Sequence, residues 1–202
     1  MRLVLASASP RRAELLRRAG FTFDVVPAEV DERVRDGESP RDYVRRLAAE
    51  KSAAVLAAIT SSVRLKPDAT SDASADLIVL GADTAVVVDG EVLGKPRDDR
   101  EAAAMLRRLS GRRHDVMTGI SLRSTSAERG LVETTGVYMV DLRDEDIDWY
   151  VASGEGRDKA GGYGIQGLAS RFIPRIDGSY TNVVGLPVAN VALLMGELAS
   201  PS

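Results

Sequence analysis

The segment that says most about the fold reads Leu77-Ile78-Val79-Leu80-Gly81-Ala82-Asp83-Thr84. Its first four residues are apolar without interruption, which is typical of a strand covered by helices on both faces. Residues 85–88 continue in extended form, and Asp89-Gly90 is a hairpin signal. We therefore expect Asp83 at the end of a buried strand, where open α/β sheets place the groups that contact ligands.

Strand-like and helix-like segments alternate on both sides of this segment. Ser9-Pro10 and Ser39-Pro40 each combine a capping serine with a proline suited to the first helical turn. The whole pattern predicts a mixed α/β domain. We expect further strands at residues 2–6, 21–26, 114–122, 132–142 and 171–176, and helices that begin near residues 10, 40, 99, 144 and 187.

The chain has 202 residues, the length of one domain or of two lobes that share a core. No internal repeat interrupts it. The stretch from Thr60 to Asp76 is rich in small polar residues, and we expect it to be a surface insertion without functional content. The sequence thus predicts a single domain over residues 1–202 with an insertion at 60–76.

Composition excludes several classes of chemistry. Cysteine is absent and His114 is the only histidine. Disulfides, thiolate zinc sites, cysteine nucleophiles and histidine-cluster metal sites are therefore excluded. For hydrolysis, carboxylate chemistry with a hard, oxygen-preferring cation remains.

Charge and hydropathy bear on partners and location. A formal net charge of −3 and an aromatic content of 4% argue against a nucleic-acid partner. No segment reaches the ~18 apolar residues of a membrane span. The apolar run at residues 3–6 is shorter than the ~7–15 residues of a signal peptide. We expect a cytoplasmic protein that binds neither nucleic acid nor membrane.

The segment Ser7-Ala8-Ser9-Pro10-Arg11-Arg12 combines several groups that suit an anion. Arg11 and Arg12 would lie in the first turn of a helix, where cations oppose the helix dipole. Hydroxyl groups, free backbone N–H groups and two guanidinium groups together form a phosphate site. The alternative is an arginine face exposed to solvent.

Asp83, Lys51 and Lys95 each admit two interpretations. Asp83 could hold a divalent cation or accept a proton from water, or it could bond its own backbone in a turn. Lys51 lies on the apolar stripe of its predicted helix, where it either snorkels to solvent or meets an anion. Lys95 in Gly94-Lys95-Pro96 does not fit a P-loop, and is either a phosphate contact or an exposed turn residue.

The glycine-rich segment Gly162-Tyr163-Gly164-Ile165-Gln166-Gly167 matches a dinucleotide-binding pattern by spacing alone. That pattern must follow a strand and open a helix, whereas this segment precedes a predicted strand. A recognition loop fits better, because Gln166 carries an amide donor and acceptor that can pair with the edge of a base. His114 alternates with apolar residues, so we expect a hydrogen-bonded strand histidine there.

Taken together, these segments resemble the Maf family of nucleoside triphosphate pyrophosphatases, once described as septum-formation inhibitors. The matching segments occur in family order and cover nearly the whole chain. They are Leu5-Ala6-Ser7-Ala8-Ser9-Pro10-Arg11-Arg12, Gly81-Ala82-Asp83-Thr84, Gly94-Lys95-Pro96, Leu109-Ser110-Gly111 with His114, Asp158-Lys159-Ala160-Gly161-Gly162-Tyr163-Gly164-Ile165-Gln166-Gly167, and Val184-Gly185-Leu186-Pro187.

The resemblance implies a single α/β domain with an elongated mixed twisted sheet flanked by helices, and two lobes around a cleft, similar to inosine triphosphatases. It implies hydrolysis of a nucleoside triphosphate to the monophosphate and pyrophosphate, with Mg²⁺ or Mn²⁺. Asp83 matches the family's proton acceptor, and Arg11, Thr84 and Gln166 match positions associated with substrate selection. The glycine-rich loop looks like that of the branch acting on dTTP and UTP.

These expectations together assign roles to the candidate residues. The triphosphate would be neutralised by Arg11, Arg12, Lys51 and Lys95 and by the helix N-terminus, where Ser7 adds a hydroxyl group. Glu32 and Asp83 are the candidate metal ligands. Asp83, directly or through the metal, would orient and deprotonate the water that attacks the α-phosphorus.

Two other functions fit the same resemblance. One is a pyrophosphatase acting on 7-methyl-GTP or a modified nucleotide, against which Gln166 argues. The other is a non-catalytic, nucleotide-binding regulator of cell division. The resemblance is also compatible with a homodimer.

Overall fold

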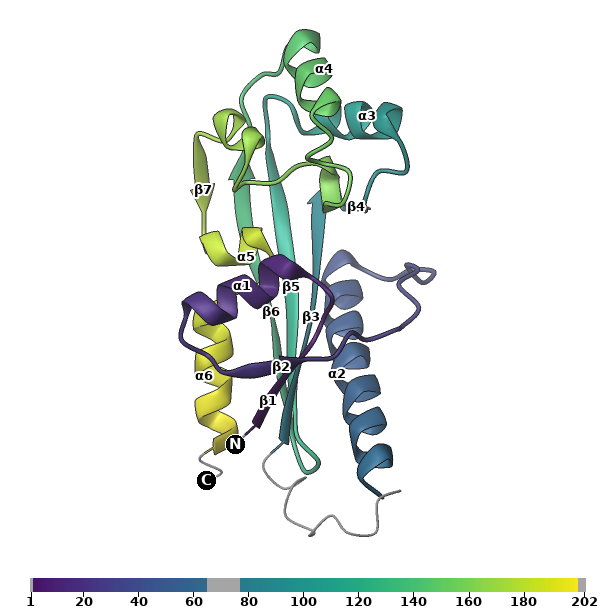
Figure 1. The fold of residues 1–202 in the computed structure, drawn as a ribbon. Helices are drawn as coiled ribbons and strands as arrows, with labels where there is room; N and C mark the ends of the chain where they lie inside the picture. The colour runs from purple at the N-terminus through teal and green to yellow at the C-terminus, as the bar shows by residue number, and fades with distance from the viewer. Residues whose placement is uncertain (1, 65–76, 200–202) are drawn as a thin grey trace.

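The computed structural model describes residues 2–64 and 77–199 and shows an elongated molecule built on one mixed sheet (Figure 1). The seven strands are β1 (Arg2–Ala6), β2 (Phe23–Val25), β3 (Leu77–Val88), β4 (Glu91–Leu93), β5 (Arg113–Arg123), β6 (Glu128–Tyr138) and β7 (Arg175–Asp177). The helices are α1 (Pro10–Arg18), α2 (Pro40–Arg64), α3 (Asp99–Leu109), α4 (Asp144–Ala152), α5 (Tyr180–Val184) and α6 (Val188–Ala199), with 3-10 turns η1 (Ala160–Gly162) and η2 (Leu168–Phe172).

The strand order is β2-β1-β3-β5-β6-β7, and β4 pairs with the distal half of β3. β1 runs parallel to β2 and β3, whereas the other pairs are antiparallel. The long strands β3, β5 and β6 follow the long axis of the molecule (Figure 1). This arrangement confirms the expected α/β fold with an elongated mixed sheet flanked by helices.

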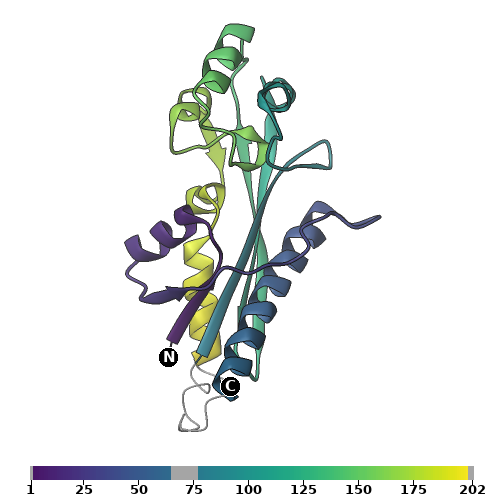
Figure 2. The same cartoon turned by 45° about the vertical axis from the view of Figure 1, so that its right-hand side comes forward.

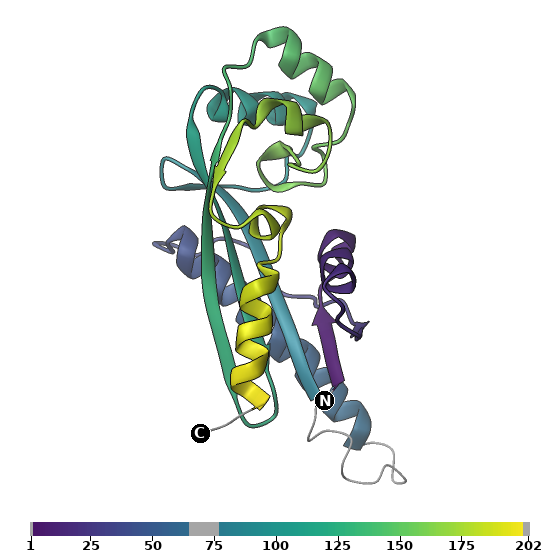
Figure 3. The ribbon, with the colours of Figure 1, turned by 90° about the vertical axis from the view of Figure 1, so that its left-hand side faces the viewer.

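Helices cover both faces of the lower part of the sheet. Figures 2 and 3 show α2 on one face and α6 on the other, with α1 beside α6. Successive residues of a strand point to opposite faces. Leu80 and Ala82 of β3 therefore pack in the cluster that includes α1 and α6, and Val79 packs with Val55 of α2. Burial on both faces is the reason for the continuous apolar run in β3.

Two glycines let α2 lie directly on the sheet. A Cβ atom on Gly81 would stand 2.1 Å from the Ala48 carbonyl oxygen of α2, and one on Gly119 would stand 2.2 Å from the Val44 carbonyl oxygen. Real Cβ atoms do not approach other atoms so closely, so only glycine fits at either position. The close approach brings the side chains of α2 within reach of the residues that follow Gly81 along β3.

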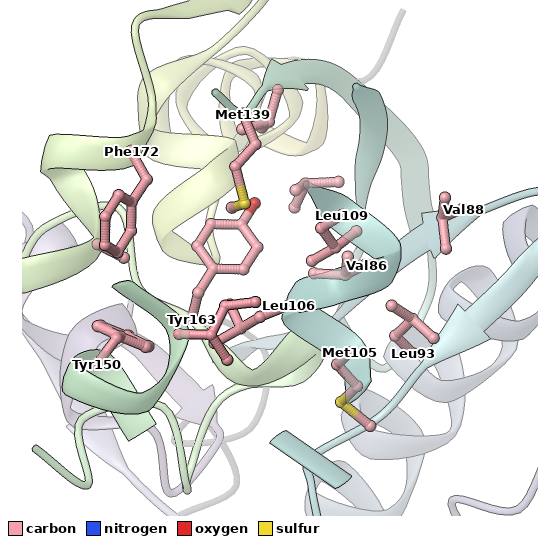
Figure 4. Packing of buried hydrophobic residues seen from close by; sticks show 14 residues of the cluster. Val86, Val88, Leu93, Met105, Leu106, Leu109, Met139, Tyr150, Tyr163 and Phe172 are labelled. Carbon is pink, nitrogen blue, oxygen red and sulfur yellow. The ribbon is translucent and has the colours of Figure 1, made fainter. Parts of the chain in front are cut away.

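The upper part of the molecule has its own apolar cluster. Tyr163 projects from the glycine-rich loop into the middle of this cluster, next to Met139 and Leu106, and Tyr150 and Phe172 lie at its side (Figure 4). The β3 strand contributes Val86 and Val88 to the cluster, so the same strand runs through the lower and the upper core. The continuity of β3 supports a single domain.

Several sequence-based boundaries differ from the structure. Asp83 lies in the middle of β3 and not at its end, because β5 pairs with residues 79–87 and keeps the strand extended. Residues 171–176 were expected to form a strand, but η2 continues to Phe172 and β7 begins only at Arg175. β6 spans 128–138 instead of 132–142, and α5 is an additional short helix.

The expected insertion at 60–76 lies only partly within the described residues. Residues 60–64 continue α2, and residues 65–76 lie outside the described residues. Within residues 2–64 and 77–199, no helix combines the length and the apolar composition that a membrane span requires.

Candidate active site

A cavity of about 790 Å³ opens where β3 has a free edge. β1 pairs with β3 only as far as Gly81, and β4 pairs with it only from Val86 onward. In the described part of the chain, residues 82–85 therefore have no strand partner on that side. Side chains from both faces of β3 reach the cavity there, since the sheet does not separate them.

The cavity contains every site residue expected from the sequence. They are Ser7, Arg11, Arg12, Glu32, Lys51, Asp83, Thr84, Lys95 and Gln166. They come from the β1–α1 turn, the loop before α2, the α2 helix, β3, the loop after β4 and the glycine-rich loop. Parallel pairing of β1 with β3 brings the β1–α1 turn and the residues that follow Gly81 to the same edge of the sheet.

Asp83, Lys51 and Glu32 form a three-membered ion cluster on the α2 face of β3. Lys51 Nζ lies 2.7 Å from Asp83 Oδ1 and 2.7 Å from Glu32 Oε1. Lys51 is buried, with only 7% of its surface exposed. Its ammonium group does not snorkel to solvent but meets two carboxylates of the protein, whereas its contact with a substrate stays a prediction.

Burial and the surrounding charges act in opposite directions on the two carboxyl groups. Burial raises the pKa of Asp83 above its ordinary value, although Lys51 and Arg12 oppose the shift. Partial burial also acts to raise the pKa of Glu32, but the hydrogen bond and charge of Lys51 outweigh it, so the pKa of Glu32 is lowered. The pKa values of the two carboxyl groups thus shift in opposite directions.

The loop that carries Glu32 is held by α2. Tyr43 Oη donates a hydrogen bond to the Glu32 carbonyl oxygen at 3.0 Å, and Arg46 Nη2 donates to the Arg33 carbonyl oxygen at 3.1 Å. Arg46 is itself fixed by a largely buried ion pair with Glu38, at 2.6 Å. One helix therefore supplies Lys51 and also places Glu32 beside it.

Arg12 and Thr84 are largely committed to contacts within the protein. Arg12 Nε donates to the Gly185 carbonyl oxygen, Nη1 to Ser7 Oγ and to the Ala82 carbonyl oxygen, and Nη2 to Thr84 Oγ1, at 2.8–3.1 Å. Four of the five guanidinium N–H groups are thereby used. Burial lowers the pKa of Arg12, against the opposing charge of Asp83. Thr84 Oγ1 also bonds Thr118 Oγ1 and the Gly185 carbonyl oxygen.

This arrangement makes Arg12 a brace for the cavity wall. It bonds the free carbonyl oxygen of Ala82 at the open edge of β3 and ties it to the β1–α1 turn through Ser7. Ser7 Oγ in turn accepts from the Ser9 backbone N–H at 3.2 Å. Most of the hydrogen-bonding groups of Arg12 and Ser7 are thus used within the protein. One Arg12 N–H group remains available to a ligand.

Arg11, in contrast, faces the glycine-rich side of the cavity. Its Nη1 lies 2.9 Å from Asp158 Oδ2 in a pair whose side chains are 30% and 64% exposed. Lys159 Nζ also contacts Asp158, at 2.6 Å. The hydrogen bond from Lys159, with that from Arg11, lowers the pKa of Asp158 to about 2. Two cations are therefore held by one exposed carboxylate that an incoming anion can replace.

Lys95 and Gln166 are exposed residues at the rim of the cavity. Lys95 follows β4, in a loop whose Gly94 carbonyl oxygen accepts a hydrogen bond from the Gly161 backbone N–H at 3.0 Å. This bond joins the lysine loop to the glycine-rich loop, so both enter the cavity from the upper part of the molecule.

His114 lies outside the cavity lining and has a structural role. Its Nε2 atom is 2.6 Å from Tyr163 Oη, and the two rings meet edge to face. Burial, together with the charges of Arg113 and Arg112, lowers the pKa of His114 to about 4, so the ring is neutral near pH 7. The expected hydrogen-bonded strand histidine is confirmed, and it anchors the glycine-rich loop through Tyr163.

Six further residues with polar side chains line the cavity, although sequence reasoning did not assign them to the site. They are Ser9, Tyr43, Glu155, Asp158, Lys159 and Tyr163. Glu155 and Asp158 could not be found by looking for residues that bind a polyanion, because a carboxylate repels phosphate. With them, the lining holds five cationic and four acidic side chains. The excess of positive charge is small until the acidic groups are displaced or screened.

The sequence was compared with family models and with known proteins, and both comparisons found matches over nearly the whole chain. The model of the family described as Maf-like protein matches residues 2–198. A protein named dTTP/UTP pyrophosphatase from Shewanella oneidensis is 51% identical, over 98% of this chain and 98% of the relative. Proteins of the same name from Anaeromyxobacter dehalogenans and Symbiobacterium thermophilum are 48% and 50% identical, over 99% and 98% of this chain and 95% of each relative.

Among solved structures, that of the Staphylococcus aureus Ham1 protein is 18% identical with a TM-score of 0.44, over 70% of this chain and 73% of that chain. This likeness is too low to bear on function.

Proposed function

The chain belongs to the Maf family, and from this we propose that it hydrolyses nucleoside triphosphates, dTTP and UTP in particular, to the nucleoside monophosphate and pyrophosphate. One structural observation supports the proposal independently of the names of the relatives. The basic segment after β1 and the carboxylate of Asp83 line the same cavity, although 71 positions separate Arg12 from Asp83 in the sequence. A site that hydrolyses a polyanion needs both groups together.

The cationic side of the cavity is suited to the triphosphate. Arg11 and Lys95 both line the cavity, from the N-terminal end of α1 and from the loop after β4. An exposed ion pair such as Arg11–Asp158 contributes about 1 kcal/mol or less, so a triphosphate with about four charges displaces Asp158 readily. The N-terminal end of α1 adds its dipole to this attraction.

Asp83 is suited to accept a proton from water. Its pKa is raised by burial, which makes its carboxylate a stronger base than an exposed one. Oδ1 contacts Lys51, which leaves Oδ2 to face the water that attacks the α-phosphorus. Lys51 also stabilises the negative charge of Asp83 before the proton moves.

The cavity has donors that suit a divalent cation, Mg²⁺ or Mn²⁺. Glu32 and Asp83 each contact Lys51 Nζ with one carboxylate oxygen, so the two carboxylates lie close together. Among residues 2–64 and 77–199, no cluster of three or more His, Cys, Asp and Glu side chains could hold a metal alone. Mg²⁺ commonly binds one or two carboxylates together with substrate phosphates, so these two residues fit. When bound, the cation would screen phosphate charge and polarise the reacting phosphoryl group.

Gln166 would read the base. Its carboxamide offers one donor and one acceptor side by side, which complements the N3–H and carbonyl edge of uracil or thymine. The residue is exposed and lines the cavity. A nucleotide placed with its phosphates at the β1–α1 turn would bring its base toward this loop.

The test is a product analysis with UTP and dTTP, Mg²⁺ and water enriched in ¹⁸O. We expect the monophosphate and pyrophosphate, with the label in the monophosphate, since water attacks the α-phosphorus. Release of a nucleoside diphosphate and orthophosphate, or label in the pyrophosphate, would show that a different bond is broken. Preference for 7-methyl-GTP in a parallel series would contradict the choice of base.

A further inference from the structure

Gln166 is presented by a tight turn at the rim of the cavity. The Gly167 backbone N–H donates to the Gly164 carbonyl oxygen at 3.3 Å, which closes a turn with Ile165 and Gln166 at its centre. Such a short turn moves as a unit. The position of the Gln166 side chain therefore depends on what holds Gly164 and the residue after Gly167.

Both ends of this turn are held by the same two side chains. The Gly164 backbone N–H donates to Tyr150 Oη at 3.2 Å, and Tyr150 Oη donates to Glu155 Oε1 at 3.0 Å. The other carboxylate oxygen, Oε2, accepts from the Leu168 backbone N–H at 2.8 Å. A continuous chain of hydrogen bonds thus runs from one end of the Gln166 turn to the other.

Tyr150 anchors this series of hydrogen bonds to the protein core. It is 1% exposed, lies on α4, and packs edge to face against Phe172 with ring centroids 6.1 Å apart (Figure 4). Only its hydroxyl group leaves the apolar cluster. The phenol is therefore held in place by the core of the upper part of the molecule, and the turn is held by the phenol.

The fit between Glu155 and the turn is close. A Cβ atom on Gly167 would stand 2.2 Å from Glu155 Oε2, so a side chain at position 167 would push the carboxylate away. The chemistry of a carboxylate matters as well. It has two acceptor oxygens and can receive the phenol and the amide together, whereas a carboxamide has one acceptor oxygen and two N–H donors.

We propose that Tyr150 and Glu155 are positioning residues that fix the Gln166 turn and thereby set base selectivity. The inference rests on the proposed function, in which Gln166 contacts the base. The edge of cytosine has donor and acceptor reversed relative to uracil. A glutamine whose backbone can shift, and whose amide can rotate, pairs with either edge. Discrimination between the two bases thus depends on how firmly the turn is held.

The experiment compares Glu155→Gln, Tyr150→Phe and Gly167→Ala with the wild-type protein. The matched control is Glu145→Gln, which makes the same chemical change on α4, at a side chain that is 83% exposed and outside the cavity lining. Two measurements are made on each variant. One is amide hydrogen exchange at Gly164 and Leu168 without ligand, and the other is kcat/KM for UTP and for CTP.

We expect faster exchange at Gly164 in Tyr150→Phe and at Leu168 in Glu155→Gln, each by about tenfold, the equivalent of one lost hydrogen bond of about 1.4 kcal/mol. Gly167→Ala should also speed exchange at Leu168, because the added Cβ atom displaces the Glu155 carboxylate without removing it. In all three variants the ratio of kcat/KM for UTP to that for CTP falls by about tenfold, while kcat for UTP changes less. The control keeps wild-type exchange and selectivity.

The outcomes separate the inference from the function on which it rests. Unchanged selectivity in variants whose turn exchanges faster overturns the inference and leaves the pyrophosphatase activity standing. An equal loss of both activities also overturns it, since a purely structural role would have that effect. A wild-type protein that hydrolyses neither nucleotide overturns the proposed function first, and the inference with it.

Discussion

Lys51 Nζ lies 2.7 Å from Asp83 Oδ1, in a contact buried between α2 and the middle of β3. The same ammonium group contacts Glu32, whose side chain is 58% exposed at the cavity mouth. The buried carboxylate thus depends on Lys51 for a counterion, whereas the exposed one can also be solvated by water. Removing any one of the three charges has a different consequence for stability and for catalysis.

Replacing Asp83 by asparagine removes the proton acceptor but not the counterion of Lys51. Because Glu32 remains beside Lys51, the Asp83→Asn variant should fold with little loss of stability. We expect kcat for UTP to fall by at least about 10²-fold, which is the lower range for the loss of a general base or an electrostatic contact. Steady-state kinetics and thermal unfolding measure the two effects separately.

The control for this variant is Asp89→Asn. Asp89 lies on the hairpin directly after β3, is exposed, and pairs with Arg112 outside the cavity lining. Its φ of 54° is one that asparagine tolerates. We expect its activity to equal that of the wild type. Retention of more than a tenth of the wild-type kcat in Asp83→Asn would show that another group accepts the proton.

Replacing Lys51 by methionine leaves Asp83 buried without its principal counterion. We expect the free energy of unfolding to fall by about 3 kcal/mol, at the low end for a broken buried pair because cavity water can reach Asp83. The double variant Lys51→Met/Asp83→Asn should be more stable than Lys51→Met alone, since it removes the uncompensated charge. Urea unfolding at pH 7 measures the cycle, and additive effects would mean that the pair is not coupled.

Arg11 and Asp158 give predictions of opposite sign. Because Asp158 competes with the triphosphate for Arg11 and Lys159, Asp158→Asn should lower KM for UTP by about two- to fivefold, the equivalent of an exposed pair of up to 1 kcal/mol. Arg11→Ala should raise KM. The control Arg18→Ala removes an exposed arginine from the opposite end of α1, where it pairs with Glu14, and should leave KM unchanged. A higher KM in Asp158→Asn would mean that Asp158 organises the site instead of blocking it.

Local signals in the sequence predicted several of the elements that line the cavity. Serine and proline at positions 9 and 10 open α1 as expected, with Ser9 Oγ accepting from the Arg12 backbone N–H. The apolar run into Gly81 predicted a buried strand, and the structure pairs this strand with β1. Once the two strands pair in parallel, their following residues meet at one edge, and that is why these motifs share a cavity.

Contacts between distant segments could not be predicted in this way. Lys51 reaches Asp83 because Gly81 lets α2 lie on the sheet, which no pattern within α2 reveals. The sequence predicts Arg12 as a phosphate ligand. In the structure, most of its N–H groups instead donate to groups of the protein, namely those of Ser7, Ala82, Thr84 and Gly185.

The predicted strand at 171–176 was wrong for a related reason. The Glu155 carboxylate accepts hydrogen bonds from the backbone at Leu168 and Ala169 and so caps the first turn of η2. Residues 171 and 172 end this helical turn, and only residues 175–177 pair with β6.

The pH dependence of stability provides a test of the buried His114–Tyr163 contact. Burial holds the pKa of His114 at about 4, against 6.5 for the unfolded chain. Below pH 6.5 the unfolded chain therefore takes up a proton that the folded protein does not. Stability falls with pH through the window from 6.5 to about 4 and then levels off for this group. Between pH 6.5 and 5 the loss is about 1.5 kcal/mol.

His114→Gln removes this ionisation and keeps a side chain able to bond Tyr163 Oη. Urea unfolding of both proteins at several pH values should show a steeper decline for the wild type between pH 6.5 and 5. Asp31, Glu38 and Asp158 have pKa values of about 2 and contribute mainly at lower pH. Asp83, whose pKa is raised, is present in both proteins, so its titration cancels in the comparison. Equal slopes for the two proteins would mean that His114 is protonated in the folded state, and that its contact with Tyr163 does not exclude the charged ring.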